Sequence, residues 1–458
     1  MHRLVRWSFA VLLAGSPLGA ANGVAQSLEA ALSNAYRANP DLNATRANVR
    51  AVDENVATAR SNYRPRITGS SDFGYSTTDT RSSGRRTTTD LNPAGLGLSL
   101  SQTIYNGGRI GNSVGAAESS VLAARETLRN TEQNTLLDGV TTYMNVLRDT
   151  AIFSLRENNV AVLTEQVRQT KDRFSVGEVT RTDVAQAEAR LAGARTELAV
   201  SQSNLRGSIA RFKQVVGLDP KKLSPVKPVV AGRLPKSQGD AVNQALREHP
   251  AIIASLHGVD AQFLQVKVVE GELLPTISLT GSLARRFDVS SPGDVRNSAS
   301  VVGSVSIPLY DGGSAYARTR QAKETLGERR LQVDSARDRV VAAVIASWAS
   351  NEATKFQIEG AAAQVQAAQI ALNGVREEYK VGQRTTLDVL NAEQELLNAR
   401  VAQVTAQRDR VVASYSVLSA TGQLSARTLG LKVATYDPKV HFEQVQDKWF
   451  GLRTPSGE

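Results

Sequence analysis

The chain has 458 residues, a formal net charge of +10, 5% aromatic residues and no cysteine. A sequence without cysteine excludes a disulfide framework, a thiol nucleophile, a cysteine-based metal site and a lipid anchor on a cysteine. The basic residues are scattered and stacking aromatics are few, so no nucleic-acid partner is expected. The four histidines are dispersed and no nucleophile or phosphate-loop motif occurs, so we expect no enzyme, no metal and no cofactor.

Residues 1–25 have the pattern of a secretory signal peptide: a positive start with Arg3 and Arg6, an apolar stretch, and small residues up to Ala25. The apolar stretch falls well short of the ~20 residues that a membrane-spanning helix needs. The small residues favour cleavage after Ala25, and cleavage after Ala20 is the alternative. No later segment reaches that length without charges, so the mature chain is expected to be exported without a spanning helix.

An internal repeat covers most of the remaining chain. Residues 32–67 align without a gap to residues 242–277 at an offset of 210, and from Tyr105 onward the offset is 205. Such a repeat predicts two similar structural units. The predicted segments are a first unit at 27–217, a Pro- and Lys-rich linker at 218–238, a second unit at 239–422 and a tail at 423–458.

Each unit begins with a region where apolar residues alternate with polar or small ones. This period of two predicts strands near 67–75, 96–101, 277–283 and 301–309, joined by polar loops at 77–90 and 288–297. Runs of about ten residues suit a tilted transmembrane strand of ~9–11 residues. A half-buried hairpin of a soluble domain would show similar alternation, so the pattern alone is weak.

Long helices are predicted after the strands, because no proline lies between Pro93 and Pro220 or between Pro308 and Pro438. Apolar residues recur every seven positions there, which is typical of a coiled-coil seam. The two series are Val184, Leu191, Leu198, Leu205 and Phe212, and Leu390, Leu397, Val404, Val411 and Leu418. A helix over 113–174 would reach roughly 93 Å, a length that suits a tube across a wide compartment.

Gly177 and Gly382 interrupt the long helices and predict a hairpin turn in each unit. Threonines just beyond them, at 180 or 182 and at 385 or 386, can cap the helices that follow. Four strands per chain cannot close a barrel, and open sheet edges are not tolerated in lipid. The chain must therefore associate, and three copies would give twelve strands and six helical hairpins.

Several motifs resemble the TolC family of outer-membrane efflux and secretion channels. The segment Tyr379–Ala392, with the sequence YKVGQRTTLDVLNA, resembles the second helix turn of that family. Phe174–Gly177 with Thr182–Val184 resembles the first turn, and Tyr105–Gly108 and Pro308–Gly313 resemble its return from strand to helix. The missing cysteine indicates the unlipidated TolC branch, and the C-terminal residues loosely resemble tails of alphaproteobacterial members.

The resemblance implies an α+β membrane protein that forms a homotrimer. Its twelve-stranded β-barrel, with four strands per chain, would lie in outer-membrane lipid and continue into a periplasmic α-helical coiled-coil tunnel. The implied function is a passive, gated conduit from periplasm to exterior, in a tripartite efflux pump or a type I secretion system. The implied partners are a periplasmic adaptor and an inner-membrane pump of the RND or ABC type.

The resemblance also places gate contacts at the hairpin turns, pairing Tyr379 and Arg384 with Thr182 and Asp183. A phenol and a guanidinium can both bond one carboxylate, and such partly wet links contribute about 1 kcal/mol each, which suits a gate that must open. Without the resemblance, Tyr379 and Arg384 would pass for ordinary exposed residues at a helix end.

A pore constriction is implied one turn further on. Asp388 matches a pore-facing aspartate of the family, and three copies would make a carboxylate ring that favours cations. The family's second aspartate is replaced here by Asn391. We therefore expect one charged ring, with weaker cation preference and weaker block by multivalent cations.

Other protein classes explain less of the sequence. A trimeric coiled-coil adhesin or stalk, on the surface or in the periplasm, would account for the heptads but not for the repeated strand pairs. A periplasmic adaptor carries one helical hairpin and does not repeat in this way. An enzyme is the most remote alternative.

Overall fold

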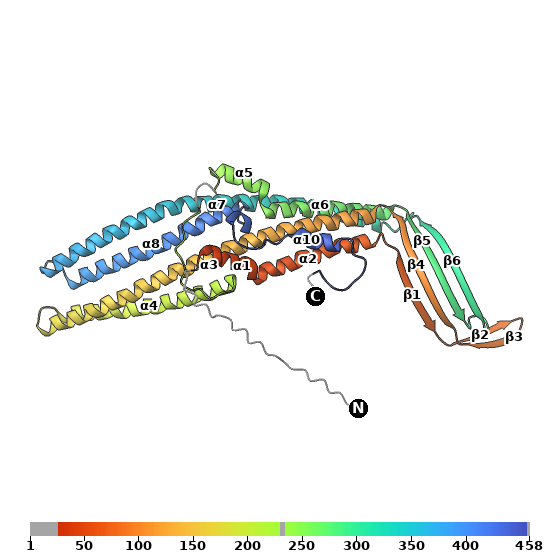
Figure 1. The fold of residues 1–458 in the computed structure, drawn as a ribbon, viewed down its shortest axis with the longest axis horizontal. Helices are drawn as coiled ribbons and strands as arrows, with labels where there is room; N and C mark the ends of the chain where they lie inside the picture. Colours follow the sequence, from red (N-terminus) through yellow and green to blue (C-terminus); the bar gives the residue numbers. More distant parts are fainter. Residues whose placement is uncertain (1–25, 230–233, 456–458) are drawn as a thin grey trace, which may run out of the picture.

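The computed structural model describes residues 26–229 and 234–455, so the predicted signal peptide lies outside the described residues. The molecule is elongated, with a strand region at one end and two long helical hairpins reaching to the other (Figure 1). The first unit contains α1 (Leu28–Ala38), α2 (Pro40–Ser61), β1 (Arg66–Phe73), β2 (Ser76–Ser82), β3 (Arg85–Leu91), β4 (Ala94–Asn106), α3 (Arg109–Ser175) and α4 (Arg181–Val216).

The second unit repeats this order with shorter strand connections. It contains α5 (Gln238–Glu248), α6 (Pro250–Glu270), the 3-10 turn η2 (Gly271–Leu273), β5 (Thr276–Phe287), β6 (Val295–Ser306), α7 (Ser314–Lys380) and α8 (Thr386–Ala420). Two short helices follow in the tail, α9 (Ala426–Leu429) and α10 (Pro438–Val445).

The long helices end where the glycines predicted. α3 and α7 have 67 residues each, and Gly177 and Gly382 follow them with φ of 79° and 78°. Only glycine reaches this left-handed region without strain, which explains both stops. Thr180 and Thr385 then cap α4 and α8, each in a reciprocal capping box with the aspartate three residues later.

The main hydrophobic core lies midway along the molecule, where α1, α3, α4 and α8 meet the linker and the tail. Tyr143 and Phe212 are fully buried in it with their rings 6.3 Å apart. The Tyr143 hydroxyl lies 2.7 and 2.8 Å from the carbonyl oxygens of Gln26 and Ser224 and shares its one hydrogen between them, which holds residue 26 and the linker against α3. Burial of each large side chain stabilises this junction by about 2 kcal/mol.

The four-stranded sheet is antiparallel with the order β1-β4-β5-β6, so β1 and β6 are its edges. Its register repeats: Ile67 faces Leu100 across β1 and β4, and Ile277 faces Val305 across β5 and β6. One face carries the apolar side chains of these rows. The opposite face carries small polar ones, with hydroxyl pairs such as Ser282 and Ser300 at 2.8 Å.

The predicted loop over 77–90 is wrong, because these residues form the β2–β3 hairpin. Ser83 and Gly84 have φ of 53° and 79°, as a two-residue hairpin turn requires. Both strands are rich in threonine, whose branched side chain favours extended backbone. The segment has no apolar face, so the alternation that revealed the other strands is missing here.

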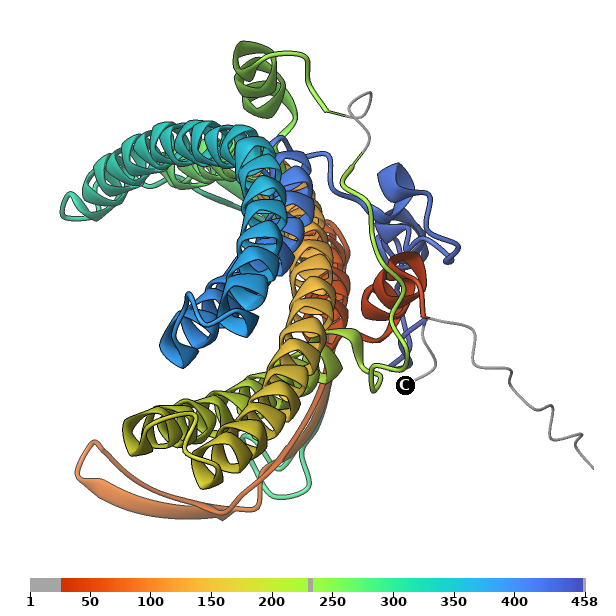
Figure 2. The ribbon, with the colours of Figure 1, turned by 90° about the vertical axis from the view of Figure 1, so that its left-hand side faces the viewer.

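The four long helices lie side by side in an arc (Figure 2). The linker, α1 and α10 lie on the convex side of the arc, and its concave side is left open. Among residues 26–229 and 234–455, the helices include none with an apolar stretch long enough to cross a membrane.

Candidate functional site

The two hairpin ends have the same backbone geometry, but the acidic and basic residues that flank each turn come in the opposite order along the chain. In the first, Arg173 on α3 pairs with Glu178 beyond the turn at 2.9 Å. In the second, Glu378 on α7 pairs with Arg384 beyond the turn at 2.7 Å. The offset of 205 places Arg173 opposite Glu378, so each turn is clamped by an ion pair of reversed polarity.

The reversed polarity allows a contact between the hairpins. The Arg173 guanidinium donates to the Tyr379 hydroxyl and lies 5.0 Å from the centre of the Tyr379 ring, in cation–π geometry. The same hydroxyl lies 3.4 Å from Oγ1 of Thr386, which is buried at the start of α8. Tyr379 is therefore held between the two hairpins by a cation from the first and a hydroxyl from the second.

Two further contacts join the hairpins just above the turns. Leu390 of α8 is buried in an apolar cluster with Leu163 and Val167 of α3 and Leu191 of α4. Next to it, Arg190 Nη2 of α4 donates to Asn391 Oδ1 of α8 at 2.7 Å. Position 391, where the family's second aspartate was expected, thus provides an uncharged acceptor for a hydrogen bond between the hairpins.

The pairing expected from the resemblance is not formed within one chain. Asp183 Oδ2 accepts from the Thr180 backbone N–H at 2.9 Å and from its hydroxyl at 2.7 Å, so the carboxylate is used by the cap of its own helix. Thr182 is exposed on α4. Arg384 bonds Glu378 and Tyr379 bonds Arg173, as described above, whereas pairing of these residues between chains stays a prediction.

Asp388 is the capping aspartate of the second hairpin. Its pKa is held below the ordinary value by hydrogen bonds from the Thr385 backbone N–H and hydroxyl, and further by the Arg384 charge. The side chain therefore remains ionised at neutral pH. It is half-exposed, while Asn391 beside it is exposed.

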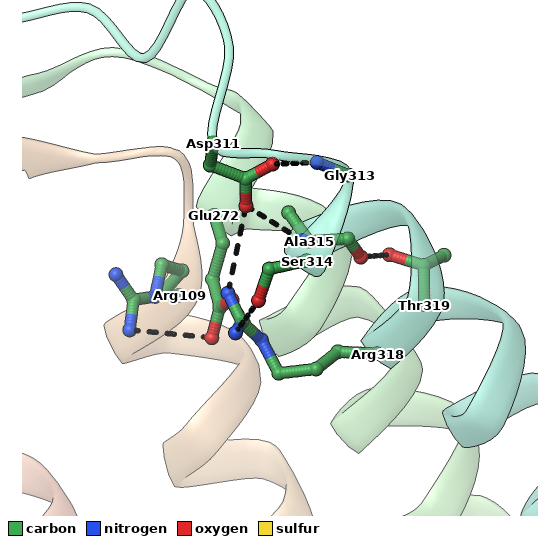
Figure 3. A network of polar contacts seen from close by, with 8 residues as sticks. All are labelled: Arg109, Glu272, Asp311, Gly313, Ser314, Ala315, Arg318 and Thr319. Carbon is green, nitrogen blue, oxygen red and sulfur yellow. Dashed lines mark hydrogen bonds and ion pairs between the residues drawn. The ribbon is translucent and has the colours of Figure 1, made fainter.

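A second polar cluster joins the sheet to the helices at the opposite end (Figure 3). Glu272 in η2 accepts from Arg318 of α7 at 2.7 and 3.0 Å, and its other oxygen lies 3.9 Å from Arg109 of α3. Asp311 caps α7 by accepting from the Ala315 N–H at 2.6 Å. Because the Glu272 carboxylate contacts an arginine on each of α3 and α7, the cluster fixes the spacing of these two helices at the base of the sheet.

The outer membrane efflux protein family matches residues 31–218 and, a second time, residues 241–423. The chain belongs to this family. It is 46% identical to the outer membrane efflux protein BepC of Brucella suis over 98% of this chain and 96% of BepC. It is 26% identical to the outer membrane protein TolC of Escherichia coli over 88% of this chain and 84% of TolC.

The same fold occurs in the CmeC outer membrane channel of Campylobacter jejuni. The two structures superpose with a TM-score of 0.79 at 19% identity, covering 92% of this chain and 89% of CmeC. The resemblance to the TolC family is therefore confirmed. As an outer membrane efflux protein, the chain is an outer-membrane channel with a large helical portion in the periplasm, and it is not an enzyme.

Sequence reasoning missed three residues of this efflux protein that contact the predicted site residues: Arg173, Glu378 and Arg190. The repeat held a signal for the first two, because Arg173 and Glu378 are opposite in charge at equivalent positions. No comparable signal pointed to Arg190, whose link to Asn391 depends on how the two hairpins lie side by side.

Proposed function

We propose that three copies of this efflux protein form a passive conduit from the periplasm to the exterior. The observation that carries the proposal is a sheet with one apolar and one polar face whose two edge strands, β1 and β6, are each paired on one side only among residues 26–229 and 234–455. In lipid such edges must be paired, and a closed ring of copies pairs them all. The arc of long helices would close in the same ring into a tunnel.

The internal repeat specifies how the edges would meet. In the chain, β4 of the first unit pairs with β5 of the second, with Ser101 opposite Thr280. The repeat makes Ser306 the equivalent of Ser101, at the offset of 205. It makes Ser70 the equivalent of Thr280, at the offset of 210, and in a ring this Ser70 belongs to the next copy. We therefore expect Ser306 of one copy opposite Ser70 of its neighbour, both on the polar, lumen-facing side.

Disulfide trapping tests this closure directly, because the chain has no cysteine of its own. A protein carrying Ser70→Cys and Ser306→Cys should give covalent trimers on oxidation in outer-membrane fractions, since facing residues bring Cβ atoms to about 4.5–5.5 Å. A matched pair, Ser70→Cys with Ser300→Cys, is displaced six residues along β6 and should remain monomeric on denaturing gels. Monomers from the first pair would overturn the proposed ring.

The hairpin ends are proposed to act as the gate. The contacts Arg173–Tyr379 and Arg190–Asn391 hold the hairpins of one chain together, and each is worth about 1 kcal/mol at a wet tunnel mouth. Links of this strength can be separated when a periplasmic adaptor and an inner-membrane pump, of the RND or ABC type, engage the tunnel end. The predicted contacts of Arg384 and Asp183 would then act between neighbouring copies.

The cargo is proposed to be small molecules. The reason is that BepC, which aligns with 98% of this chain, is named an efflux protein. Deleting the gene should raise sensitivity to several unrelated drugs. Measuring secreted protein in the same strain tests the alternative, a type I secretion channel. Unchanged drug sensitivity with a lost secreted protein would move the assignment from efflux to secretion.

A further inference from the structure

The C-terminal segment follows the outer side of the molecule to the base of the sheet. α10 packs on α2, where His441 Nδ1 lies 2.9 Å from Oδ2 of the buried Asp53. Beyond α10 the chain runs beside α2 toward the start of β1 before it turns back (Figure 1). The tail therefore extends from the middle of the helical part to the point where the strands begin.

Two arginines hold the end of this segment in place. Arg60, in the last turn of α2, bonds Asp447 at 2.9 Å and Gln446 at 3.2 Å. Arg64, two residues before β1, donates to the Lys448 carbonyl at 2.8 Å, and its guanidinium lies 4.4 Å from the centre of the Trp449 ring. The position of Trp449 is thus tied to the base of the sheet.

The held segment exposes large apolar side chains. Trp449, Phe450 and Leu452 are 60%, 86% and 103% exposed, so three large apolar side chains within four residues are open to the surroundings. Lys448 Nζ donates to the Arg453 carbonyl at 2.7 Å and closes the segment into a short loop. The loop 448–453 is therefore an apolar tip with a cationic residue at each end.

The surroundings of this loop favour lipid over water or another copy. The apolar face of the sheet begins at Ile67, which is 63% exposed and follows Arg64 by three residues, so the loop lies near the start of the surface that is proposed to meet lipid. The tail lies on the convex side of the helical arc, away from the concave side (Figure 2). Tryptophan between cationic residues is typical of the membrane–water interface, where an apolar ring meets phosphate groups.

We propose that the loop 448–453 is an interfacial anchor, which inserts Trp449, Phe450 and Leu452 among the phospholipids of the periplasmic leaflet. Lys448 and Arg453 would lie among the lipid phosphates. The anchor would fix the depth of the sheet in the membrane from the periplasmic side. It requires only that the sheet lies in the outer membrane, and not the proposed gate.

Tryptophan fluorescence tests the anchor, because Trp348 and Trp449 are the only tryptophans after the predicted signal peptide. The processed protein with Trp348→Phe, reconstituted in phosphatidylglycerol-containing vesicles, reports Trp449 alone. Replacing the lipid by one brominated near the headgroup should remove about half of this emission, and bromines deep in the acyl chain should remove less. The matched protein with Trp449→Phe reports Trp348 in the helical tunnel and should keep its emission.

A second variant separates lipid from a neighbouring copy as the occupant. The changes Trp449→Ser, Phe450→Ser and Leu452→Ser together should leave the assembly and its channel conductance unchanged if the tip meets lipid. Trp449 emission that brominated lipid does not quench would overturn the anchor. Dissociation of the assembly in the serine variant would also overturn it, by assigning the tip to contact between copies.

Discussion

The two helical hairpins have closely similar backbones, but the charged residues at their ends are reversed. Each has a 67-residue first helix, a left-handed glycine and a capping box, so the repeat has kept the turn geometry. The residues that clamp the turns are reversed, with Arg173 and Glu178 in the first and Glu378 and Arg384 in the second. Glycines and caps therefore build the hairpin, and the reversed charges make the two ends complementary to each other.

The largest effect is expected from removing that complementarity. Arg173→Glu loses the bonds to Glu178 and to Tyr379, and places two negative charges at the first turn. The hydrogen bond and the cation–π contact with Tyr379 join the hairpins, and losing both, about 1.5 kcal/mol together, should raise the open fraction of the channel about tenfold, measured as open probability in single-channel recordings.

Two further variants sharpen this prediction. Arg168→Glu changes the same charge on α3, where Arg168 pairs with neighbours on its own helix and with no other acidic residue in the described part of the chain, and should leave the open fraction unchanged. The triple change Arg173→Glu, Glu178→Arg and Tyr379→Phe restores the clamp and also removes the phenol, from which a carboxylate at position 173 would accept a hydrogen bond. If that triple variant closes as well as the wild type, the contact with Tyr379 has no role in gating.

A smaller change is expected at Asn391. Asn391→Asp would turn the link from Arg190 into an ion pair, and should lower the open fraction about fivefold. It would also add a second carboxylate ring in the trimer, so multivalent cations should block the pore more strongly. With Arg190→Gln added, the stronger block should remain while closure returns to the wild-type level. Wild-type block as strong as that of Asn391→Asp would contradict the single-ring prediction.

Acidic pH should remove the charge of Asp388. The pKa of Asp388 is lowered, so its charge and its cap contribution are fully present above the ordinary aspartate value near pH 4. Both are lost as the pH falls through the lower folded pKa. Thr385→Ala removes the hydroxyl bond to the Asp388 carboxylate and keeps the backbone N–H bond, which lowers the pKa most, so cation preference, measured as reversal potential, should disappear at a slightly higher pH.

The equivalent change in the first hairpin serves as the control. Thr180→Ala should cost about the same stability, about 1 kcal/mol, without moving the pH at which cation preference is lost. An unmoved midpoint in Thr385→Ala would show that Asp388 does not set the ion preference.

The smallest difference is expected at the turn glycines themselves. Gly177 and Gly382 have φ of 79° and 78°, and an added Cβ meets nothing within 4 Å at either. Alanine should therefore cost only the left-handed strain, about 1 kcal/mol, and the same amount at both sites. Thermal unfolding of the assembly measures this cost, and clearly unequal costs would mean that the two turns are not equivalent.

Patterns local in sequence predicted most of the fold, and contacts between distant segments were harder to predict. Proline-free stretches and heptads predicted the long helices, and the glycines predicted both turns. The β2–β3 hairpin was missed because its strands are polar on both faces. Tyr379 was singled out, but its partner within the chain, Arg173, was not, because a link between helices 206 residues apart depends on packing rather than on spacing.

The Arg173–Tyr379 contact is proposed to hold the two hairpins of a chain together in the closed channel. A double-mutant cycle on the open fraction, with Arg173→Ala, Tyr379→Phe and both, tests it most directly. The contact predicts that each single variant opens the channel and that the double variant opens it little further, with a coupling of about 1 kcal/mol. Effects that simply add would contradict the claim.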